Sequence, residues 1–277
     1  RSQGYRLANK QAGFIESTLR ERGGWQVEAP RAWIERAARP ADARECPPLG
    51  SLDAVLRPYQ KQGVAWLWFL RQHGLGGVLA DEMGLGKTLQ TLALLAAAQA
   101  RTGPGPRRLP SLVVCPTSLV FNWVAEAARF VPSMRVLPMQ GPERQARFDE
   151  VPHHDLVVTS YALIRRDARQ YRAIEFDTAV LDEAQHIKNR ETQNAQAVKA
   201  IRARHRLVLT GTPLENSVLD LWSIFDFLMP GYLGAAQDFR ERYEIPIARD
   251  RDPAVQDRLA RRVRAFLLRR VKRDVAP

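Results

Sequence analysis

Cysteine is scarce in this sequence. Cys46 and Cys115 are its only two cysteines, and 69 positions separate them in a chain of 277 residues. Structural zinc sites and disulfide-stapled domains need several cysteines or histidines at short spacings, and neither cysteine has such neighbours. The sequence therefore indicates neither a zinc site nor a disulfide framework, and a reducing, cytoplasmic setting is the expectation.

Long apolar runs are also missing. Gly63 to Leu70 and Thr88 to Ala100 are two largely apolar stretches without charge. Both are shorter than the roughly 18 residues that a membrane span needs, so we expect neither a transmembrane segment nor a membrane partner. The chain opens with Arg1 and has no apolar signal-peptide core, so we expect it to be part of a longer protein.

Lysine is rare among the basic residues, since 36 of the 42 are arginine, a bias typical of a GC-rich genome. Together they outnumber the 30 acidic residues and give a net charge of +12. Such a charge favours a polyanionic partner, although it does not separate nucleic acid from an anionic membrane surface. With 45% hydrophobic residues, the chain can bury a full core.

The chain divides into two predicted parts. Residues 1–50, which end in Cys46-Pro47-Pro48-Leu49-Gly50, predict an appended helical segment and linker, and residues 51–277 predict an α/β domain. In that domain, short apolar runs alternate with helical stretches such as Thr88 to Gln99 and Leu119 to Phe130. The runs that predict strands are Gly77 to Ala80, Leu112 to Cys115, Met134 to Met139, Leu156 to Thr159, Ala179 to Leu181 and Leu207 to Leu209. Uniformly apolar strands suit a mostly parallel sheet with helices on both faces.

The end of the chain, residues 216–277, predicts a helical and basic segment. Residues 240–274 hold twelve Arg or Lys and six Asp or Glu. Apolar side chains recur there at helical spacing from Val255 to Leu267, while Arg258, Arg261, Arg262 and Arg264 project elsewhere. Both a solvated helix face and a contact surface for polyphosphate fit this pattern.

A phosphate-binding loop is predicted after the first apolar run. The residues are Asp81-Glu82-Met83-Gly84-Leu85-Gly86-Lys87-Thr88, followed directly by a predicted helix. Glycines let backbone N–H groups approach a phosphate, and the helix N-terminus adds partial positive charge. Lys87 would reach the β and γ phosphates and Thr88 would bind Mg²⁺. The strict pattern has glycine where this chain has Asp81, and a structural turn is the alternative.

An acidic motif follows another apolar run, at Asp182-Glu183-Ala184-Gln185. Adjacent carboxylates at the end of a buried strand are unfavourable unless a metal or a partner neutralises them. Asp182 would hold Mg²⁺ through a water molecule, and Glu183 would deprotonate the attacking water. Alone, such a pair is also typical of a loop start or a helix N-cap.

Two further elements complete the predicted site. Leu209-Thr210-Gly211-Thr212-Pro213 follows the last apolar run, where hydroxyl groups would sense the γ-phosphate or simply close a turn. Leu56-Arg57-Pro58-Tyr59-Gln60 precedes the phosphate loop. The Gln60 amide offers one donor and one acceptor, which matches the N6 and N7 edge of adenine.

Together these residues resemble the Swi/Snf helicase-like ATPases of helicase superfamily two, in particular their prokaryotic branch. The resemblance runs from about Leu52 to Asp274. It rests on eight ordered segments: Leu56 to Gln60, Asp81 to Thr88, Val113 to Trp123, Thr159 to Tyr161, Asp182 to Gln185, Ile187 to Asn189, Leu209 to Asn216, and Leu267 to Asp274.

The resemblance implies the first, RecA-like P-loop NTPase lobe of a motor that uses ATP and Mg²⁺ to move along double-stranded DNA. It implies that Gln60 contacts adenine and that Asp182 and Glu183 serve metal and water. The residues that it places along a DNA groove are Thr117, Ser118, Thr159, Ser160, Lys188, Asn189 and Asn216. Hydroxyl, amide and ammonium groups suit phosphate contacts that read no base, although Asn189 and Asn216 would also suit helix caps.

A second RecA-like lobe is expected after Pro277, and it would supply the arginine finger. Arg269 and Arg270 are finger candidates by residue type only, because the resemblance puts them at the end of the first lobe. We therefore expect the isolated chain to hydrolyse ATP poorly. RNA polymerase, a repressor or another DNA-bound protein would be the target of displacement at a bacterial nucleoid.

Two alternatives remain open. An RNA helicase lobe has the same fold, but Gln185 ends the acidic motif where RNA helicases carry Asp or His, and Leu-Thr-Gly-Thr-Pro stands where they commonly show Ser-Ala-Thr. A non-catalytic DNA-binding module is the other alternative. Against it, Lys87, Thr88, Asp182 and Glu183 are all present.

Overall fold

The computed structural model describes residues 45–102, 108–211 and 218–275. The predicted helical segment 1–50 lies almost entirely outside the described residues, as do Thr212, Pro213 and Asn216. Among the described residues, no helix combines the length and the apolar character that crossing a membrane requires.

The centre of the molecule is a seven-stranded sheet in the order β3-β4-β2-β5-β6-β1-β7, and all of its strand pairs are parallel. Its strands are β1 (Gly77–Leu79), β2 (Ser111–Cys115), β3 (Val136–Pro138), β4 (Leu156–Ser160), β5 (Glu175–Asp182), β6 (Arg202–Leu209) and β7 (Leu267–Leu268). The six predicted strands are confirmed. The structure lengthens β5 and β6 toward their amino ends and adds β7, which the sequence analysis did not predict.

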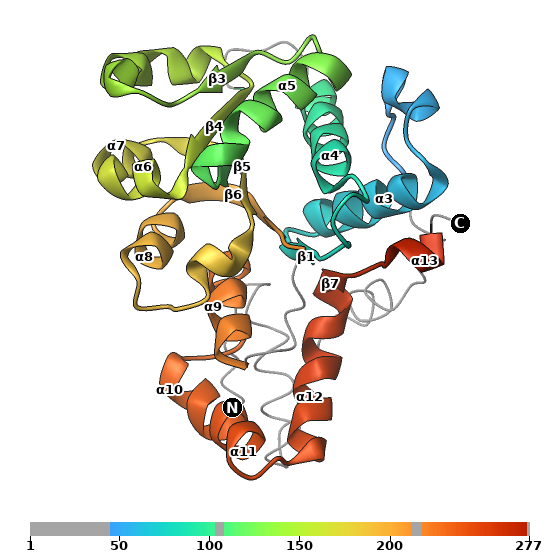
Figure 1. Ribbon diagram of the computed structural model, residues 1–277, viewed down its shortest axis with the longest axis vertical. Coiled ribbons are helices and arrows are strands. Elements are labelled where there is room, and N and C mark those ends of the chain that lie inside the picture. Colours follow the sequence, from blue (N-terminus) through green and yellow to red (C-terminus); the bar gives the residue numbers. More distant parts are fainter. Residues whose placement is uncertain (1–44, 103–107, 212–217, 276–277) are drawn as a thin grey trace, which may run out of the picture.

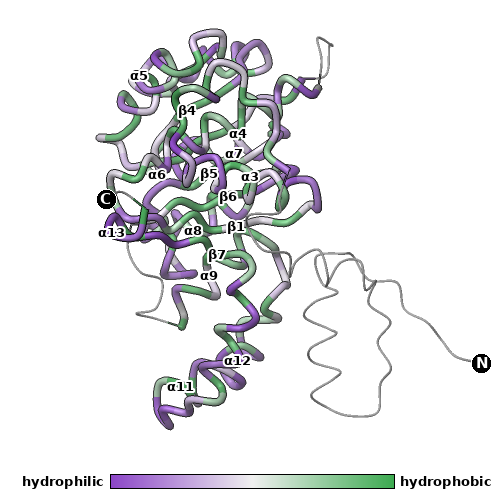
Figure 2. Tube along the Cα trace, turned by 90° about the vertical axis from the view of Figure 1, so that its right-hand side faces the viewer, coloured by the Kyte–Doolittle hydropathy of each residue, from purple (hydrophilic) through white to green (hydrophobic). Residues whose placement is uncertain are grey.

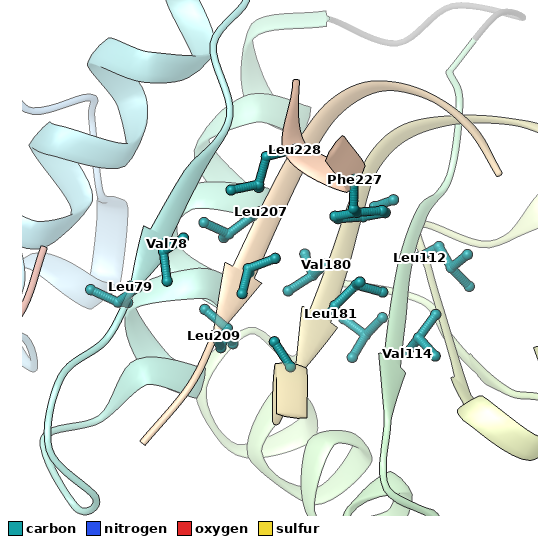
Figure 3. Packing of buried hydrophobic residues seen from close by; sticks show 14 of the residues in the cluster. Val78, Leu79, Leu112, Val114, Val180, Leu181, Leu207, Leu209, Phe227 and Leu228 are labelled. Atoms are coloured by element: carbon teal, nitrogen blue, oxygen red, sulfur yellow. The ribbon is translucent and has the colours of Figure 1, made fainter. Parts of the chain in front are cut away.

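The apolar strand sequences are explained by burial on both faces of the sheet. Every residue of β2 and of β4 is buried. Figure 3 shows Val78, Val180 and Leu207 from three different strands within one cluster of buried side chains. At about 25 cal/mol per Å² of apolar surface removed from water, this cluster supplies the main favourable free energy of folding.

Helices cover both faces of the sheet. The α-helices are α3 (Pro58–Gln72), α4 (Lys87–Thr102), α5 (Val120–Phe130), α6 (Tyr161–Arg166), α7 (Ala168–Ala173), α8 (Gln193–Lys199), α9 (Val218–Leu228), α10 (Ala236–Phe239), α11 (Ile245–Ala248), α12 (Pro253–Val263) and α13 (Lys272–Val275). The shorter 3₁₀ or π segments are η2 (Gly50–Ala54), η3 (Thr117–Leu119), η4 (Pro142–His153), η5 (Ala184–Ile187), η7 (Arg240–Glu244) and η8 (Arg264–Phe266). Helix α4 packs against α3 and α5, whereas α8 packs against α6 and α9, and Figure 1 shows these two groups on opposite sides of the sheet.

Helices α11 and α12 extend away from the sheet (Figures 1 and 2). Helix α12 begins where the Asp252 carboxylate accepts hydrogen bonds from the backbone N–H groups of Ala254 and Val255. Val255, Leu259 and Val263 are buried, which confirms the predicted apolar spacing. The expected helical continuation to Leu267 is wrong, because α12 ends at Val263 and Leu267 pairs with β1 as part of β7.

Two of the four arginines in α12 and the following η8 have partners that the structure shows. Arg258 lies over the Tyr243 ring, with its guanidinium carbon 5.5 Å from the ring centre. Arg262 donates a hydrogen bond of 2.8 Å to the Tyr243 hydroxyl. Arg261 and Arg264 are exposed, so the two alternatives of solvated face and phosphate contact stay open for these two residues alone.

Candidate nucleotide-binding site

The predicted site elements meet at the carboxyl edge of three neighbouring strands. Asp81 follows β1, Asp182 ends β5, and Thr210 and Gly211 follow β6. Strand β6 lies between β1 and β5, so the sheet order brings these residues together although Asp81 is more than a hundred positions from the others in sequence. The carboxyl ends of parallel strands are where open α/β sheets bind ligands.

The phosphate loop has the backbone that its glycines permit. Gly84 and Gly86 have φ angles of 89° and 77°, which lie in the left-handed region. Helix α4 starts directly afterwards at Lys87, whose ammonium donates a 2.8 Å hydrogen bond to the Asp81 carbonyl. The left-handed backbone requires glycine at position 86, and a Cβ there would lie 2.4 Å from the Gln60 amide nitrogen and would displace that side chain.

The Asp81 side chain holds the loop in place. It is fully buried, and its two carboxylate oxygens accept hydrogen bonds of 2.9 and 2.5 Å from the Arg270 guanidinium. The Gln90 amide donates another at 3.2 Å. The sequence prediction placed Asp81 in the ATP-binding loop but missed this ion pair, because 189 positions separate the partners. The Arg270 guanidinium is therefore bound to the residue at which the phosphate loop begins.

Gln60 also binds the phosphate loop. Its amide nitrogen donates a 3.1 Å hydrogen bond to the Leu85 carbonyl, and its oxygen accepts one of 3.0 Å from the Arg57 N–H. The Tyr59 hydroxyl donates to the same Leu85 carbonyl at 3.2 Å. Helix α3 thus supports the loop from one side, and the contact of Gln60 with adenine stays a prediction.

Asp182 is oriented by hydrogen bonds from three directions. The Trp123 indole N–H donates to Oδ2 at 2.9 Å, and the Glu183 backbone N–H donates to Oδ1 at 2.9 Å. The Tyr161 hydroxyl donates to the Asp182 carbonyl at 2.8 Å. Burial raises the pKa of Asp182 and the Glu183 charge raises it further, whereas the Trp123 hydrogen bond lowers it. A divalent cation beside Asp182 would favour its charged form.

Glu183 has a backbone conformation that is rare for a residue with a side chain. Its φ and ψ angles of 52° and 62° are left-handed, which costs about 1 to 3 kcal/mol. Residues held in this way cluster at functional sites. Glu183 is partly exposed, Ala184 behind it is buried and Gln185 is exposed.

The described residues fit a nucleotide triphosphate with a divalent cation. The loop with left-handed glycines leads into a helix of 16 residues, whose N-terminus favours a phosphate group. Lys87 supplies a cation, and a Cβ on Gly211 would lie 3.7 Å from its ammonium nitrogen. Thr88 in the first turn of α4 and Asp182 at the end of β5 are the residues that would hold Mg²⁺.

The predicted DNA contacts divide into exposed and buried residues. Thr117 and Ser118 are exposed in η3, directly after β2. Thr159 and Ser160 have exposed fractions of 0% and 1%, and the Thr159 hydroxyl donates to the Met139 carbonyl. Both side chains are therefore covered in this structure, and the DNA contact of Thr159 and Ser160 stays a prediction.

Lys188 and Asn189 line a groove of about 390 Å³ whose other lining residues are both basic and acidic: Arg190, Arg240, Glu191, Asp220 and Glu244. Lys188 forms a 3.1 Å ion pair with Asp220. The Asn189 side-chain oxygen accepts a 2.9 Å hydrogen bond from the Glu191 N–H, so Asn189 closes a local turn, while Thr192 caps α8. Both residues remain partly or fully exposed, and their contact with DNA stays a prediction.

Comparison with known proteins shows the family. The sequence matches the family model of the SNF2-related domain over residues 59–277. This chain belongs to the SNF2-related domain family. The resemblance that the motifs indicated is thereby confirmed.

SNF2 relatives occur in bacteria and eukaryotes. The chain is 43% identical over 227 residues to the putative ATP-dependent helicase/translocase YwqA of Bacillus subtilis, covering 81% of this chain and 24% of that protein. It is 39% identical over 269 residues to the TATA-binding protein-associated factor MOT1 of Saccharomyces cerevisiae, covering 90% of this chain and 14% of that protein. The chain thus spans a quarter or less of these two relatives.

Solved SNF2 structures share the fold. The Sulfolobus solfataricus SWI2/SNF2 ATPase core in complex with dsDNA matches with a TM-score of 0.73 and 40% identity, covering 78% of this chain and 44% of that one. The same core domain in a second structure matches with a TM-score of 0.75 and 37% identity, covering 84% of this chain and 47% of that one. The predicted RecA-like lobe is confirmed by these matches.

Proposed function

We propose that this chain is the ATP-binding lobe of an ATP-dependent double-stranded DNA translocase. The observation that carries the proposal is the arrangement of Lys87, Thr88, Asp182 and Glu183 at one sheet edge, in a chain of the SNF2 family. The similar Sulfolobus ATPase core was solved with dsDNA, which supports a duplex as the polyanionic partner of this basic chain.

In the proposed reaction, the chain's residues bind and orient the reactants. The glycine loop and Lys87 hold the phosphates, and Thr88 with Asp182 holds Mg²⁺, which neutralises charge on the phosphates when bound. Glu183 orients the attacking water and accepts its proton. Gln60, next to the loop, contacts adenine, and Thr117, Ser118, Lys188, Asn189 and Asn216 contact the DNA backbone.

The site requires a second lobe. Arg270 is bound to Asp81, which argues against its service as an arginine finger and supports a finger from a second RecA-like lobe. The intact protein would displace RNA polymerase or another DNA-bound protein. It would act at a bacterial nucleoid, a setting that the arginine-rich composition of the chain supports.

The test of the proposed base is Glu183→Gln in the intact protein that contains this chain. We expect ATP binding to be retained and turnover to fall by about 10² or more, because the amide accepts no proton from water. Hydrolysis is measured with duplex DNA and with single-stranded RNA. Turnover that survives the substitution would refute the role of Glu183, and stimulation by RNA instead of duplex DNA would refute the translocase.

A further inference from the structure

The hydrogen bond between Trp123 and Asp182 links two functions that the sequence keeps apart. Asp182 is the proposed metal ligand, whereas Trp123 belongs to α5, directly after the exposed turn with Thr117 and Ser118. The indole nitrogen lies 2.9 Å from Asp182 Oδ2, and the exposed fractions of the two residues are 1% and 7%. A buried hydrogen bond to a charged acceptor is among the stronger ones in proteins.

The Asp182 backbone is held independently of α5. The Tyr161 hydroxyl, at the start of α6, binds the Asp182 carbonyl, and β5 pairs with β6 up to Asp182 itself. The carboxylate receives one bond from the adjacent Glu183 N–H and one from Trp123. The Trp123 bond is thus the one that ties the carboxylate's orientation to another element.

Helix α5 connects the exposed turn to the Trp123–Asp182 hydrogen bond. The turn η3 (Thr117–Leu119) leads into α5 without a break. Ser118 precedes Trp123 by five residues, about 7.5 Å along a helix axis. Val120 and Ala127, which are both fully buried, anchor the same face of α5 as Trp123. Because η3 continues into α5, a contact that restrains the turn also restrains the amino end of the helix that carries the indole.

We propose that Trp123 is a positioning residue that couples duplex DNA bound at Thr117 and Ser118 to the orientation of the Asp182 carboxylate. This inference rests on the proposed function. DNA on the exposed turn holds α5 in place, the indole N–H fixes Oδ2, and Asp182 then presents its remaining lone pairs to the cation. The Trp123–Asp182 bond is already formed in the structure, so bound DNA restrains the carboxylate further and does not create its orientation.

The test replaces the indole in the intact protein. Trp123→Phe keeps an aromatic ring but removes the donor. Trp66→Phe is the matched control, because Trp66 is a buried tryptophan at 3% exposure on α3 and has no hydrogen bond to Asp182. Trp123→His is smaller but retains a ring N–H, so it separates the donor from the ring volume.

The first readout is the ratio of ATP hydrolysis with and without duplex DNA. We expect this ratio to fall roughly tenfold in Trp123→Phe, as for the loss of a hydrogen bond to a charged group. The second readout does not depend on turnover: DNA affinity is compared with and without a non-hydrolysable ATP analogue and Mg²⁺. Binding linkage is reciprocal, so the ATP analogue should change DNA affinity by about fivefold or more in the unmodified protein. In Trp123→Phe, the DNA affinities with and without the analogue should agree within about twofold.

The outcomes separate this inference from the proposed function. The coupling is supported if Trp123→Phe loses both the DNA stimulation of hydrolysis and the effect of the ATP analogue on DNA affinity. Trp66→Phe should then keep both ratios, and Trp123→His should be intermediate. Ratios retained in Trp123→Phe, or lost equally in all three variants, would overturn it while leaving the translocase intact. An unmodified protein with neither stimulation nor coupling would overturn the proposed function and this inference together.

Discussion

Arg270 and Asp81 form an ion pair at the start of the phosphate loop, with side-chain exposures of 12% and 0%. Arg270 also binds the Gln90 amide oxygen at 2.7 Å and the Tyr59 carbonyl. Gly63 makes room for this cluster, because a Cβ at that position would lie 2.8 Å from the Arg270 guanidinium. One side chain near the end of the described chain therefore holds both α3 and the loop.

Replacing Arg270 by Gln should destabilise the protein strongly. Removal of one partner leaves the buried Asp81 carboxylate without its charge partner, which costs about 3 to 5 kcal/mol. Denaturant unfolding measures the change, and ATP affinity should fall as well. Arg273→Gln is the control, because Arg273 is 88% exposed and pairs only with the neighbouring Asp274 in the described structure. Equal stability of the two variants would contradict a structural role for the buried pair.

The two cysteines should differ in reactivity. Burial, and secondarily the Asp182 charge, raises the pKa of the Cys115 thiol to about 12, so almost none of it is thiolate at neutral pH. Cys46 is exposed. We expect iodoacetamide to modify Cys46 in the folded protein and both cysteines after denaturation, as mapped by mass spectrometry. Rapid modification of Cys115 in the folded state would refute its burial.

At the scale of elements, Arg71 joins the last turn of α3 to β5. Its guanidinium donates hydrogen bonds of 2.9 Å to both Asp177 carboxylate oxygens and one of 2.8 Å to the Thr178 hydroxyl. Burial would raise the pKa of Asp177, but the hydrogen bond and charge of Arg71 lower it overall. The pair therefore stabilises the fold when Asp177 is ionised.

Arg71→Gln should reduce the free energy of unfolding by about 2 to 3 kcal/mol at pH 7. This loss is smaller than for breaking a fully buried ion pair, because Arg71 and Asp177 are both slightly exposed. Because the folded pKa of Asp177 is lowered, the stabilisation is present above its unfolded pKa of about 3.9 and is lost as the pH falls through the folded pKa. The stability difference between the proteins should therefore shrink in acid. Arg204→Gln removes the exposed pair with Glu175 and should change stability little. A difference independent of pH would contradict the assignment to Asp177.

At the scale of the molecule, the proposed function predicts that this chain forms one face of an ATP site and that a second lobe completes it. The SNF2 core structures are more than twice as long as the part that this chain covers, since it spans 44% and 47% of them. An arginine finger typically contributes about 10³ to 10⁵ in rate. The position of the phosphate loop at the sheet edge allows a second lobe to close on it.

The whole-molecule prediction compares this chain with a form extended through a following lobe. We expect the chain alone to bind nucleotide weakly and to hydrolyse ATP at least about 10³-fold more slowly. Duplex DNA should stimulate the extended form, whereas single-stranded RNA should not. Robust DNA-stimulated hydrolysis by the 277 residues alone would refute the split site.

The apolar runs of the sequence predicted strands correctly, whereas strand residues next to charged positions were missed. The apolar parts of β5 and β6 were predicted, but their first residues were not, because Glu175 and Arg202 are exposed. Strand β7 has only two residues, both partly buried, and arginines follow it directly. Its strand character comes from pairing with β1, which no local pattern indicates.

The sequence by itself determined the ordered motifs, the α/β class and the membership of a helicase-like ATPase family, because these depend on local residue types and spacing. Only the tertiary structure decided which partner each buried polar group has. Trp123 and Asp182 are 59 positions apart, and Arg270 and Asp81 are 189 apart. Such pairs depend on the order of the strands in the sheet. Strand β1 lies between β6 and β7, and both of these come much later in the sequence.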